Sequence, residues 1–268
     1  MIKLYFKAKI LALKRRLHIL IFKEFNPYPN IPNNIYLSPS SIIDNHKYTD
    51  QKLKYKKSNL NTDKWKNNSR NKLRELISYN NKLYCKEILN QNINFNKDYT
   101  RKRIYIEFSK FRNAPIDIIT KDNVKKYKGI IICMQGTNSG AHLNLEEIRM
   151  PSDIFKVKNG SGLAIQAAEH GFIAVSFERI GFGERRERLL KSRNFSPTID
   201  FSFHSLLYGK TSLGETVSEL SALIAWLKKR YTVNYKIWLK GYSAAGTTAI
   251  AAAAIDNNVD GIAIGGCV

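Results

Sequence analysis

The segment from Gly241 to Gly246 reads Gly-Tyr-Ser-Ala-Ala-Gly, which places a serine between small residues. An apolar run at residues 235–240 precedes it and an alanine-rich stretch follows it. A serine on a tight turn between strand and helix projects its hydroxyl from the carboxyl edge of a sheet, and small neighbours allow close packing around that turn. We interpret Ser243 as a nucleophile for acyl transfer. A serine in a small-residue turn without a catalytic role is the alternative.

Acyl transfer also needs hydrogen-bond donors for the oxyanion that forms when the serine attacks a carbonyl. The backbone N–H of Ala244, directly after the serine, is one predicted donor. The second is expected in the loop after the apolar run at residues 129–134, where Gly136 and Thr137 are both candidates. Both loops would lie at the carboxyl ends of adjacent parallel strands.

A general base for Ser243 is not evident in the sequence. All the histidines precede this serine: His18, His46, His142, His170 and His204. Asp256 and Asp260 follow it, but their place in a helix-to-strand turn puts them at the opposite end of the sheet, where turn residues are expected. His142 could approach the catalytic edge, although a structural or substrate-contacting role is favoured over a replacement base.

No metal or cofactor is expected, since metal-ligand spacing, a glycine-rich phosphate loop and a nucleotide fingerprint are all absent from the sequence. The mixed charges at residues 184–188 favour a solvated or internally paired loop. A rim that binds an acidic or polar substrate is the alternative for this loop.

The order of elements predicts an α/β fold with a mostly parallel sheet and flanking helices. Asn-rich segments such as residues 90–96 are interpreted as compositional bias, residues 181–210 as irregular, and Asp63 as a helix N-cap. The predicted strands are 104–108, 114–120, 129–134, 172–177, 235–240 and 261–265, and the predicted helices are 63–80, 161–170, 211–230 and 244–255.

The net charge of +22 is concentrated in the N-terminal portion of the chain. Residues 1–128 hold 29 Lys/Arg and 10 Asp/Glu, whereas residues 129–268 hold 15 and 12. We therefore divide the chain into a basic N-terminal helix and irregular segment, residues 1–62, and an α/β domain, residues 63–268. Compositional drift is favoured as the origin of the charge, with a surface for anionic membranes or polyanions as the alternative. Nucleic acid is not expected, because aromatic stacking motifs are missing.

The cysteines and the first 25 residues bear on localisation. Cys85, Cys133 and Cys267 are scattered, which fits neither a disulfide framework nor a zinc site and favours a reducing, cytoplasmic compartment. Cys133 is expected to be buried. Residues 1–25 contain no apolar run as long as the ~18 residues of a membrane span or the ~7 of a secretory signal core. A helix packed on the domain is favoured, and a peripheral membrane helix is the alternative.

Six sequence blocks stand in order along the chain, at residues 72–76, 130–136, 164–174, 181–185, 206–210 and 241–243. Together they resemble α/β-hydrolases of the acetyl xylan esterase and dienelactone hydrolase type. The resemblance implies an esterase, commonly a deacetylase of sugars, without metal or organic cofactor. It also implies that Ser243 matches the nucleophile and that the turn from Gln135 to Thr137 matches the oxyanion loop.

The sequence departs from this family pattern in three places. Gln135 stands where many members have histidine, and Ala245 stands where glycine is commoner. The last two strands and the remaining triad members are missing, which predicts an α/β-hydrolase domain truncated after its sixth strand. We expect a serine-dependent carboxylesterase for a small-molecule ester, inactive or impaired as the 268-residue chain. The alternative is a non-catalytic remnant whose basic N-terminal part binds membrane or polyanion. The sequence does not predict the acyl part or the alcohol part of the substrate, or the oligomeric state of the protein.

Overall fold

A computed structural model describes residues 2–23, 40, 43, 53–55, 61–96, 98–186, 198–231 and 234–267. The chain divides into two compact units, Met1–Lys54 and Tyr55–Val268. In the first unit, helix α1 spans Ile2–Phe22, so the helix expected within the first 25 residues is present. None of the helices in the described ranges is both long and apolar enough to cross a bilayer. The boundary expected after residue 62 stays a prediction, and most of the stretch expected to be irregular, 26–62, lies outside the described residues.

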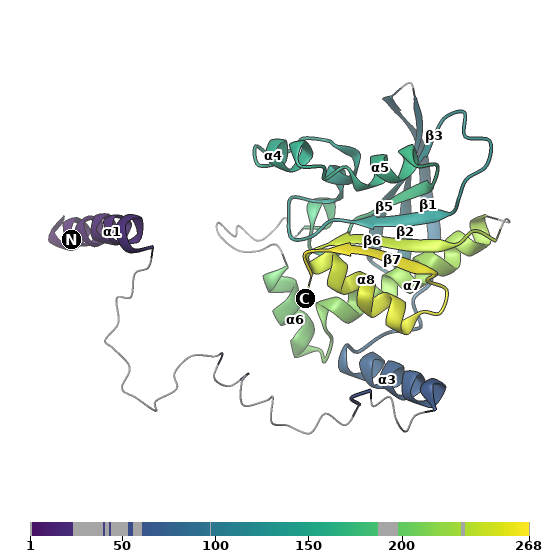
Figure 1. The fold of residues 1–268 in the computed structure, drawn as a ribbon, viewed down its shortest axis with the longest axis horizontal. Coiled ribbons are helices and arrows are strands. Elements are labelled where there is room, and N and C mark those ends of the chain that lie inside the picture. The colour runs from purple at the N-terminus through teal and green to yellow at the C-terminus, as the bar shows by residue number, and fades with distance from the viewer. Residues whose placement is uncertain are drawn as a thin grey trace. The chain divides into compact units, whose positions relative to one another are not determined.

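The second unit is built on a mixed sheet of seven described strands in the order β1-β2-β3-β5-β4-β6-β7 (Figure 1). The first strands, up to the β3–β5 pair, are antiparallel, whereas β5, β4, β6 and β7 are parallel to one another. The strands are β1 Lys86–Asn96, β2 Tyr99–Ser109, β3 Arg112–Lys121, β4 Ile130–Met134, β5 Ile173–Phe177, β6 Ile237–Tyr242 and β7 Gly261–Gly265.

Helices cover both faces of this sheet. The α-helices are α3 Thr62–Leu76, α4 Asp153–Lys158, α5 Leu163–Glu169, α6 Ile199–Leu207, α7 Ser212–Arg230 and α8 Ala244–Ile255. Two short 3₁₀ helices, η1 Ala141–Leu145 and η2 Gly183–Arg185, lie in the loops after β4 and β5. This alternation of parallel strands and helices confirms the α/β class. The expectation of a mostly parallel sheet is wrong, because the three pairs that join β1, β2, β3 and β5 are antiparallel.

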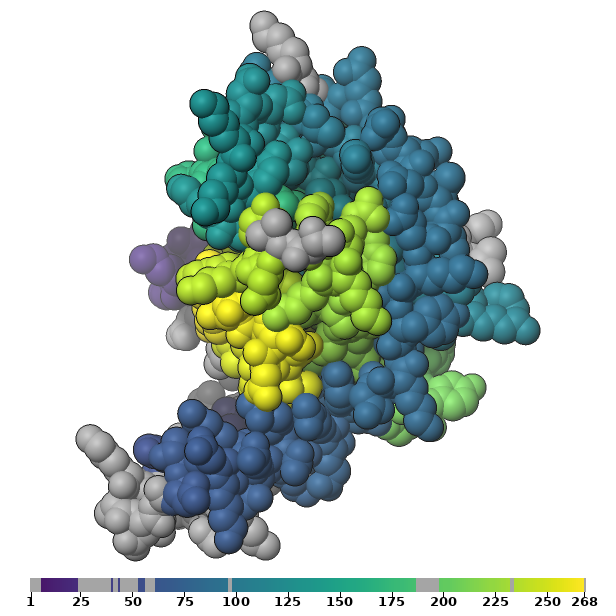
Figure 2. Space-filling view, turned by 90° about the vertical axis from the view of Figure 1, so that its right-hand side faces the viewer, coloured from purple at the N-terminus to yellow at the C-terminus, as the bar shows by residue number. Residues whose placement is uncertain are grey.

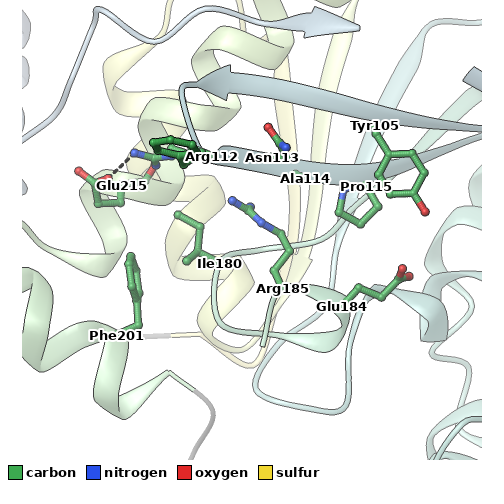
Figure 3. A pocket seen from close by; sticks show the side chains of 11 residues that line it. Tyr105, Arg112, Asn113, Ala114, Pro115, Ile180, Glu184, Arg185, Phe201 and Glu215 are labelled. Atoms are coloured by element: carbon green, nitrogen blue, oxygen red, sulfur yellow. Dashed lines mark hydrogen bonds and ion pairs between the residues drawn. The ribbon is translucent and has the colours of Figure 1, made fainter. Parts of the chain in front are cut away.

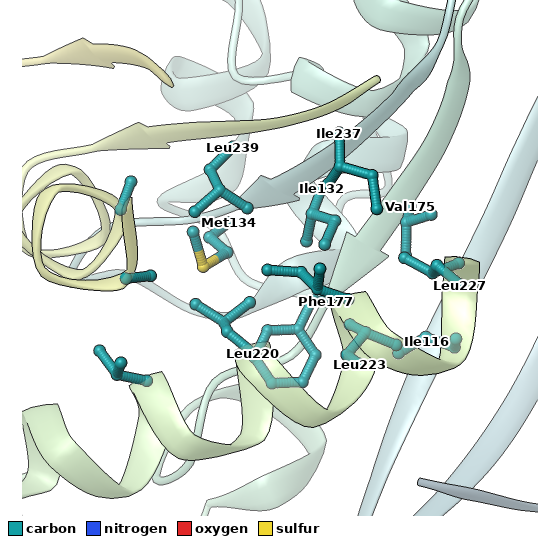
Figure 4. Close-up of a cluster of buried hydrophobic side chains, with 14 of the residues drawn as sticks. Ile116, Ile132, Met134, Val175, Phe177, Leu220, Leu223, Leu227, Ile237 and Leu239 are labelled. Atoms are coloured by element: carbon teal, nitrogen blue, oxygen red, sulfur yellow. The ribbon is translucent and has the colours of Figure 1, made fainter. Parts of the chain in front are cut away.

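Side chains alternate between two cores because successive residues of a strand point to opposite faces. Ile132 and Met134 of β4 belong to the larger core, in which they pack with residues of α7 such as Leu220 (Figure 4). Cys133, between them in sequence, belongs to the smaller core with the alanines of α5. Cys133 is fully buried, as expected. Central strands covered on both faces read as continuous apolar runs, which is why this one was recognisable.

Helix α3 is tied to the C-terminal end of α8 through backbone carbonyls. Arg70 donates to the carbonyl of Ala254 and Arg74 to that of Ile255, each at 3.0 Å. The space-filling view shows the blue surface of α3 beside the yellow C-terminal segment (Figure 2). The arginines satisfy acceptors that the end of a helix leaves without an intrahelical donor.

Three details of the predicted element order are wrong. The Asn-rich stretch interpreted as compositional bias forms most of β1, so the described sheet has seven strands and not six. Helix α6 lies in the stretch expected to be irregular. Helix α3 is capped by Asn61, whose side chain accepts from the N–H groups of Asp63 and Lys64, and not by Asp63. Asn61 takes this role because it is the residue with extended backbone directly before the helix.

Candidate active site

Ser243 occupies a strained turn between β6 and α8. Its φ of 55° and ψ of −129° place it in a region that residues with a side chain rarely adopt. The turn is closed by small residues: a Cβ atom on Gly241 would lie 2.6 Å from the carbonyl oxygen of Ala245. The serine is partly exposed and stands at the carboxyl end of β6. This is the geometry of a nucleophile elbow.

Ala244 is the first residue of α8, so its N–H has no acceptor within the helix. A helix N-terminus also carries partial positive charge. Gly136 lies against the other side of the elbow, because β4 pairs with β6 and Met134 is level with Gly241. A Cβ atom added to Gly136 would lie 2.7 Å from the carbonyl oxygen of Tyr242 and 3.1 Å from the Cβ of Ser243.

Arg179, two residues after β5, holds the turn that contains Gly136. Its Nε donates to the carbonyl of Gln135 and its Nη2 to the carbonyl of Gly136, each at 3.0 Å. In a trans peptide the C=O and N–H bonds point in opposite directions. The two carbonyls turned toward Arg179 therefore turn the N–H groups of Gly136 and Thr137 away from it. Burial lowers the pKa of the Arg179 guanidinium to about 10, so it stays charged at neutral pH.

The sequence match agrees with this geometry. A model of the abhydrolase family matches residues 33–263, which is most of the chain. The chain belongs to the abhydrolase family.

Solved structures show the same fold at low identity. A candidate acetyl xylan esterase from Bacteroides fragilis is 16% identical, with a TM-score of 0.68 over 87% of this chain and 62% of that one. A glucuronoyl esterase from Solibacter usitatus is also 16% identical, with a TM-score of 0.51 over 80% of this chain and 62% of that one. The abhydrolase chain thus spans 62% of the length of each. A comparison with curated proteins finds no match.

In the abhydrolase, His142 is held in the loop after β4 by two partners. Its Nε2 lies 2.9 Å from Oδ2 of Asp153 and 3.3 Å from Oγ of Ser139, which itself donates to Asp153. Both partners use the same ring nitrogen, whereas the histidine of a catalytic triad uses one nitrogen for serine and the other for the carboxylate. Burial opposes ionisation of Asp153, but hydrogen bonds from Ser139, His142 and two backbone N–H groups outweigh it and hold its pKa well below the usual range. The cluster therefore anchors the loop.

The other candidate acids and bases lie elsewhere. His170 ends α5, where its Nδ1 lies 2.7 Å from the carbonyl of Gln166. Asp260 accepts the N–H of Ile237 at the start of β6, and Asp256 accepts that of Asn258, so both are turn residues, as expected. His18 lies in α1 and His204 in α6, while His46 falls outside the described residues. No hydrogen bond recorded between described residues joins a histidine to Ser243.

A cavity of about 560 Å³ opens at the sheet edge beyond the end of β5 (Figure 3). The start of β3, the loop after β5, α6 and α7 contribute its walls, and Ser243 is not among its lining residues. Two arginines in the wall, Arg112 and Arg185, are neutralised by carboxylates of α7. Arg185 pairs with Glu219, while Arg112 pairs with both Glu215 and Glu219. In the described part of the charge run at 184–188, Glu184 pairs with Arg103 and Arg149 and Arg185 pairs with Glu219, while Arg186 is exposed, which agrees with the favoured solvated or internally paired loop.

Glu178, next to Arg179, is a buried carboxylate that holds the loop between β4 and η1. It accepts the N–H of Ala141 at 3.0 Å on each oxygen. Burial raises its pKa to about 7, against an ordinary value of 4.5. Glu178 and Arg179 are not among the site residues expected from the sequence. Their signal was two charged residues directly after an apolar strand, at the edge where sites of α/β sheets lie.

Because the pKa of Glu178 is raised in the folded state, the stability of the abhydrolase fold depends on the protonation of this carboxyl and therefore on pH. The folded state favours the protonated carboxyl of Glu178. The stabilisation that this preference gives the folded state is therefore full below pH 4.5 and is lost as the pH rises through about 7. We expect the unfolding free energy of the wild type to fall relative to Glu178→Gln by roughly 2–3 kcal/mol between pH 5 and 8. Urea denaturation of both proteins at each pH measures this. Parallel pH profiles would contradict it.

Proposed function

We propose that this chain is an ester hydrolase in which Ser243 is the nucleophile. The observation that carries the proposal is the strained backbone of Ser243 with Gly136 packed against it. The Oγ of Ser243 attacks the ester carbonyl, the alcohol leaves, and water releases the acyl group from the serine. The N–H groups of Ala244 and of Gly136 or Thr137 stabilise the oxyanion. No metal or organic cofactor takes part.

The substrate class follows from the names of the similar structures. An acetyl xylan esterase and a glucuronoyl esterase are both named for esters of sugars. We therefore propose a small-molecule ester, with acetylated sugars as the first compounds to assay. The described residues offer no histidine bonded to Ser243, so we propose that the 268-residue polypeptide is impaired on its own and that an external base restores part of the rate.

An active-site-directed probe tests the role of Ser243. A fluorophosphonate reacts with a serine hydroxyl held in an oxyanion hole, and imidazole in the buffer can take the proton. We expect labelling that rises with imidazole concentration and that peptide mass spectrometry assigns to Ser243. Labelling spread over many serines, or equal before and after heat denaturation, would overturn the proposal.

Gly136→Ala tests the oxyanion turn separately from the nucleophile. The added Cβ would meet the carbonyl oxygen of Tyr242 at 2.7 Å, a backbone atom that cannot yield without moving the elbow. We expect the Ser243 labelling rate to fall by about 10²-fold, the usual effect of removing one oxyanion donor. Thr137→Ala is the matched control, since it alters an exposed side chain and keeps the N–H. An equal loss in the two variants would contradict this role of Gly136.

A second candidate is a hydrolase-fold protein without turnover, whose basic N-terminal part binds a membrane or a polyanion. The paired state of His142 and the cationic sequence of α1 favour it. The two candidates differ in one result. If Ser243 stays unlabelled at any imidazole concentration while α1 binds an anionic surface, the second candidate replaces the first.

A further inference from the structure

Helix α1 carries a regular apolar stripe. Five of its large apolar residues recur with alternating spacings of four and three, which keeps these five on one side of the helix, whereas Leu11, Ile19 and Phe22 lie off this side. The stripe consists of Phe6, Ile10, Leu13, Leu17 and Leu20. All five side chains are exposed, from 51% for Leu17 to 79% for Leu20. Stripes of this kind are usually buried against a partner, because the free energy falls when each large apolar side chain leaves water.

Cations follow the stripe on both sides. Lys9 and Arg16, seven residues apart, lie along one flank, and Lys7 and Lys14, also seven apart, lie along the other. The helix contains six Lys/Arg and no Asp/Glu. In the heptad pattern of a coiled coil these four residues would fill the positions next to the seam. Two copies of α1 would face each other with like charges at every such position, in either orientation, so a second copy is disfavoured.

An anionic bilayer surface satisfies both features at once. Apolar side chains of an interfacial helix enter the boundary between headgroups and acyl chains, while Lys and Arg extend to the phosphates beside it. The helix is 21 residues long but interrupted by charge, so it suits the plane of the membrane and not a span across it. A soluble polyanion would pair with the cations and leave the stripe exposed.

We propose that α1 is an in-plane anchor that binds membranes rich in anionic lipid. The stripe supplies the insertion and the flanking cations supply the selectivity for negative charge. This anchor is independent of the chemistry at Ser243, and it would place an ester hydrolase at a membrane surface whether or not turnover is fast.

Co-sedimentation of the full chain with vesicles tests the anchor. We expect binding to phosphatidylcholine vesicles with 30% phosphatidylglycerol, and at least tenfold weaker binding to vesicles of phosphatidylcholine alone. Each cation near an anionic surface contributes about fivefold in affinity, so Lys14→Gln with Arg16→Gln should weaken binding about 25-fold. The binding should also weaken when salt rises from 0.1 to 0.5 M.

A pair of double variants separates the stripe from general hydrophobicity. Leu13→Ser with Leu17→Ser removes two residues of the stripe, and we expect binding to fall by tenfold or more. Leu11→Ser with Ile19→Ser is the matched control, since both residues are apolar and exposed but lie off the stripe, and it should bind within about threefold of the wild type. Circular dichroism in the presence of vesicles checks that each variant still forms the helix.

Three outcomes would overturn the proposal. The first is equal loss of binding in the two double variants. The second is heparin or RNA binding as tight as vesicle binding and insensitive to the stripe, which would assign α1 to a polyanion. The third is self-association of the chain that disappears with Leu13→Ser and Leu17→Ser, which would assign the stripe to a second copy.

Discussion

Ser243→Ala should abolish serine-dependent ester hydrolysis by this abhydrolase. The expected loss is at least 10³-fold in the part of p-nitrophenyl acetate hydrolysis that exceeds the buffer and imidazole background, because the variant has no atom to accept the acyl group. The strained backbone of Ser243 supports this expectation. Strain of that kind persists where the surrounding structure imposes it, and it is concentrated at functional turns. The measurement is the initial rate at several imidazole concentrations for wild type and variant.

Ser139→Ala is the matched control for this experiment. Ser139 lies in the loop after β4 and contacts both His142 and Asp153, so it belongs to a group of serine, histidine and aspartate that does not include Ser243. Its geometry is that of a loop anchor, and its removal should leave the imidazole-dependent rate within about threefold. If Ser139→Ala loses the rate and Ser243→Ala keeps it, the nucleophile is Ser139 and the proposed function fails at this site.

The central parallel strands and the turn at Ser243 could be predicted from the sequence because each is indicated by residues that are close together in the chain. The bounds of the last strand, Gly261–Gly265, match the prediction, and the apolar run at 129–134 became β4. Strand β1 was missed because it lies at the edge of the sheet, where none of its described side chains is fully buried and polar residues fill most of its positions. Its pairing with β2 supplies the backbone partners that identify it as a strand.

The candidate site was predictable in part for the same reason. Ser243 and Ala244 stand in one contiguous motif, and Gly136 follows from the adjacency of parallel strands. The contact of Arg179 with the carbonyls of Gln135 and Gly136 joins residues more than 40 positions apart in sequence. The pairing of Glu219 with Arg112 spans 107 positions, and no spacing rule connects such residues. Long-range ion pairs of this kind are set by the packing of the fold.

Glu219→Ala should destabilise the fold more than any other change of a single charge at this edge of the sheet. Glu219 is fully buried in α7, and its carboxylate accepts from Nε of Arg112 at 2.6 Å and from two nitrogens of Arg185 at 2.7 and 2.8 Å. Its removal leaves the largely buried Arg185 without its carboxylate partner, whereas Arg112 keeps Glu215. Loss of one partner of a buried ion pair costs about 3–5 kcal/mol. Urea denaturation at pH 7 measures the loss in unfolding free energy.

Glu215→Ala gives the comparison that isolates burial from charge. Glu215 lies one turn earlier on the same helix and also pairs with Arg112, but 14% of its side chain is exposed and it does not contact Arg185. We expect a loss of about 1–2 kcal/mol, because Arg112 keeps Glu219 and water can reach the vacated position. Equal losses in the two variants would mean that Arg185 is compensated by another group. The difference between them therefore measures how strongly Glu219 holds together β3, α7 and the loop after β5, which contribute walls of the cavity beyond the end of β5.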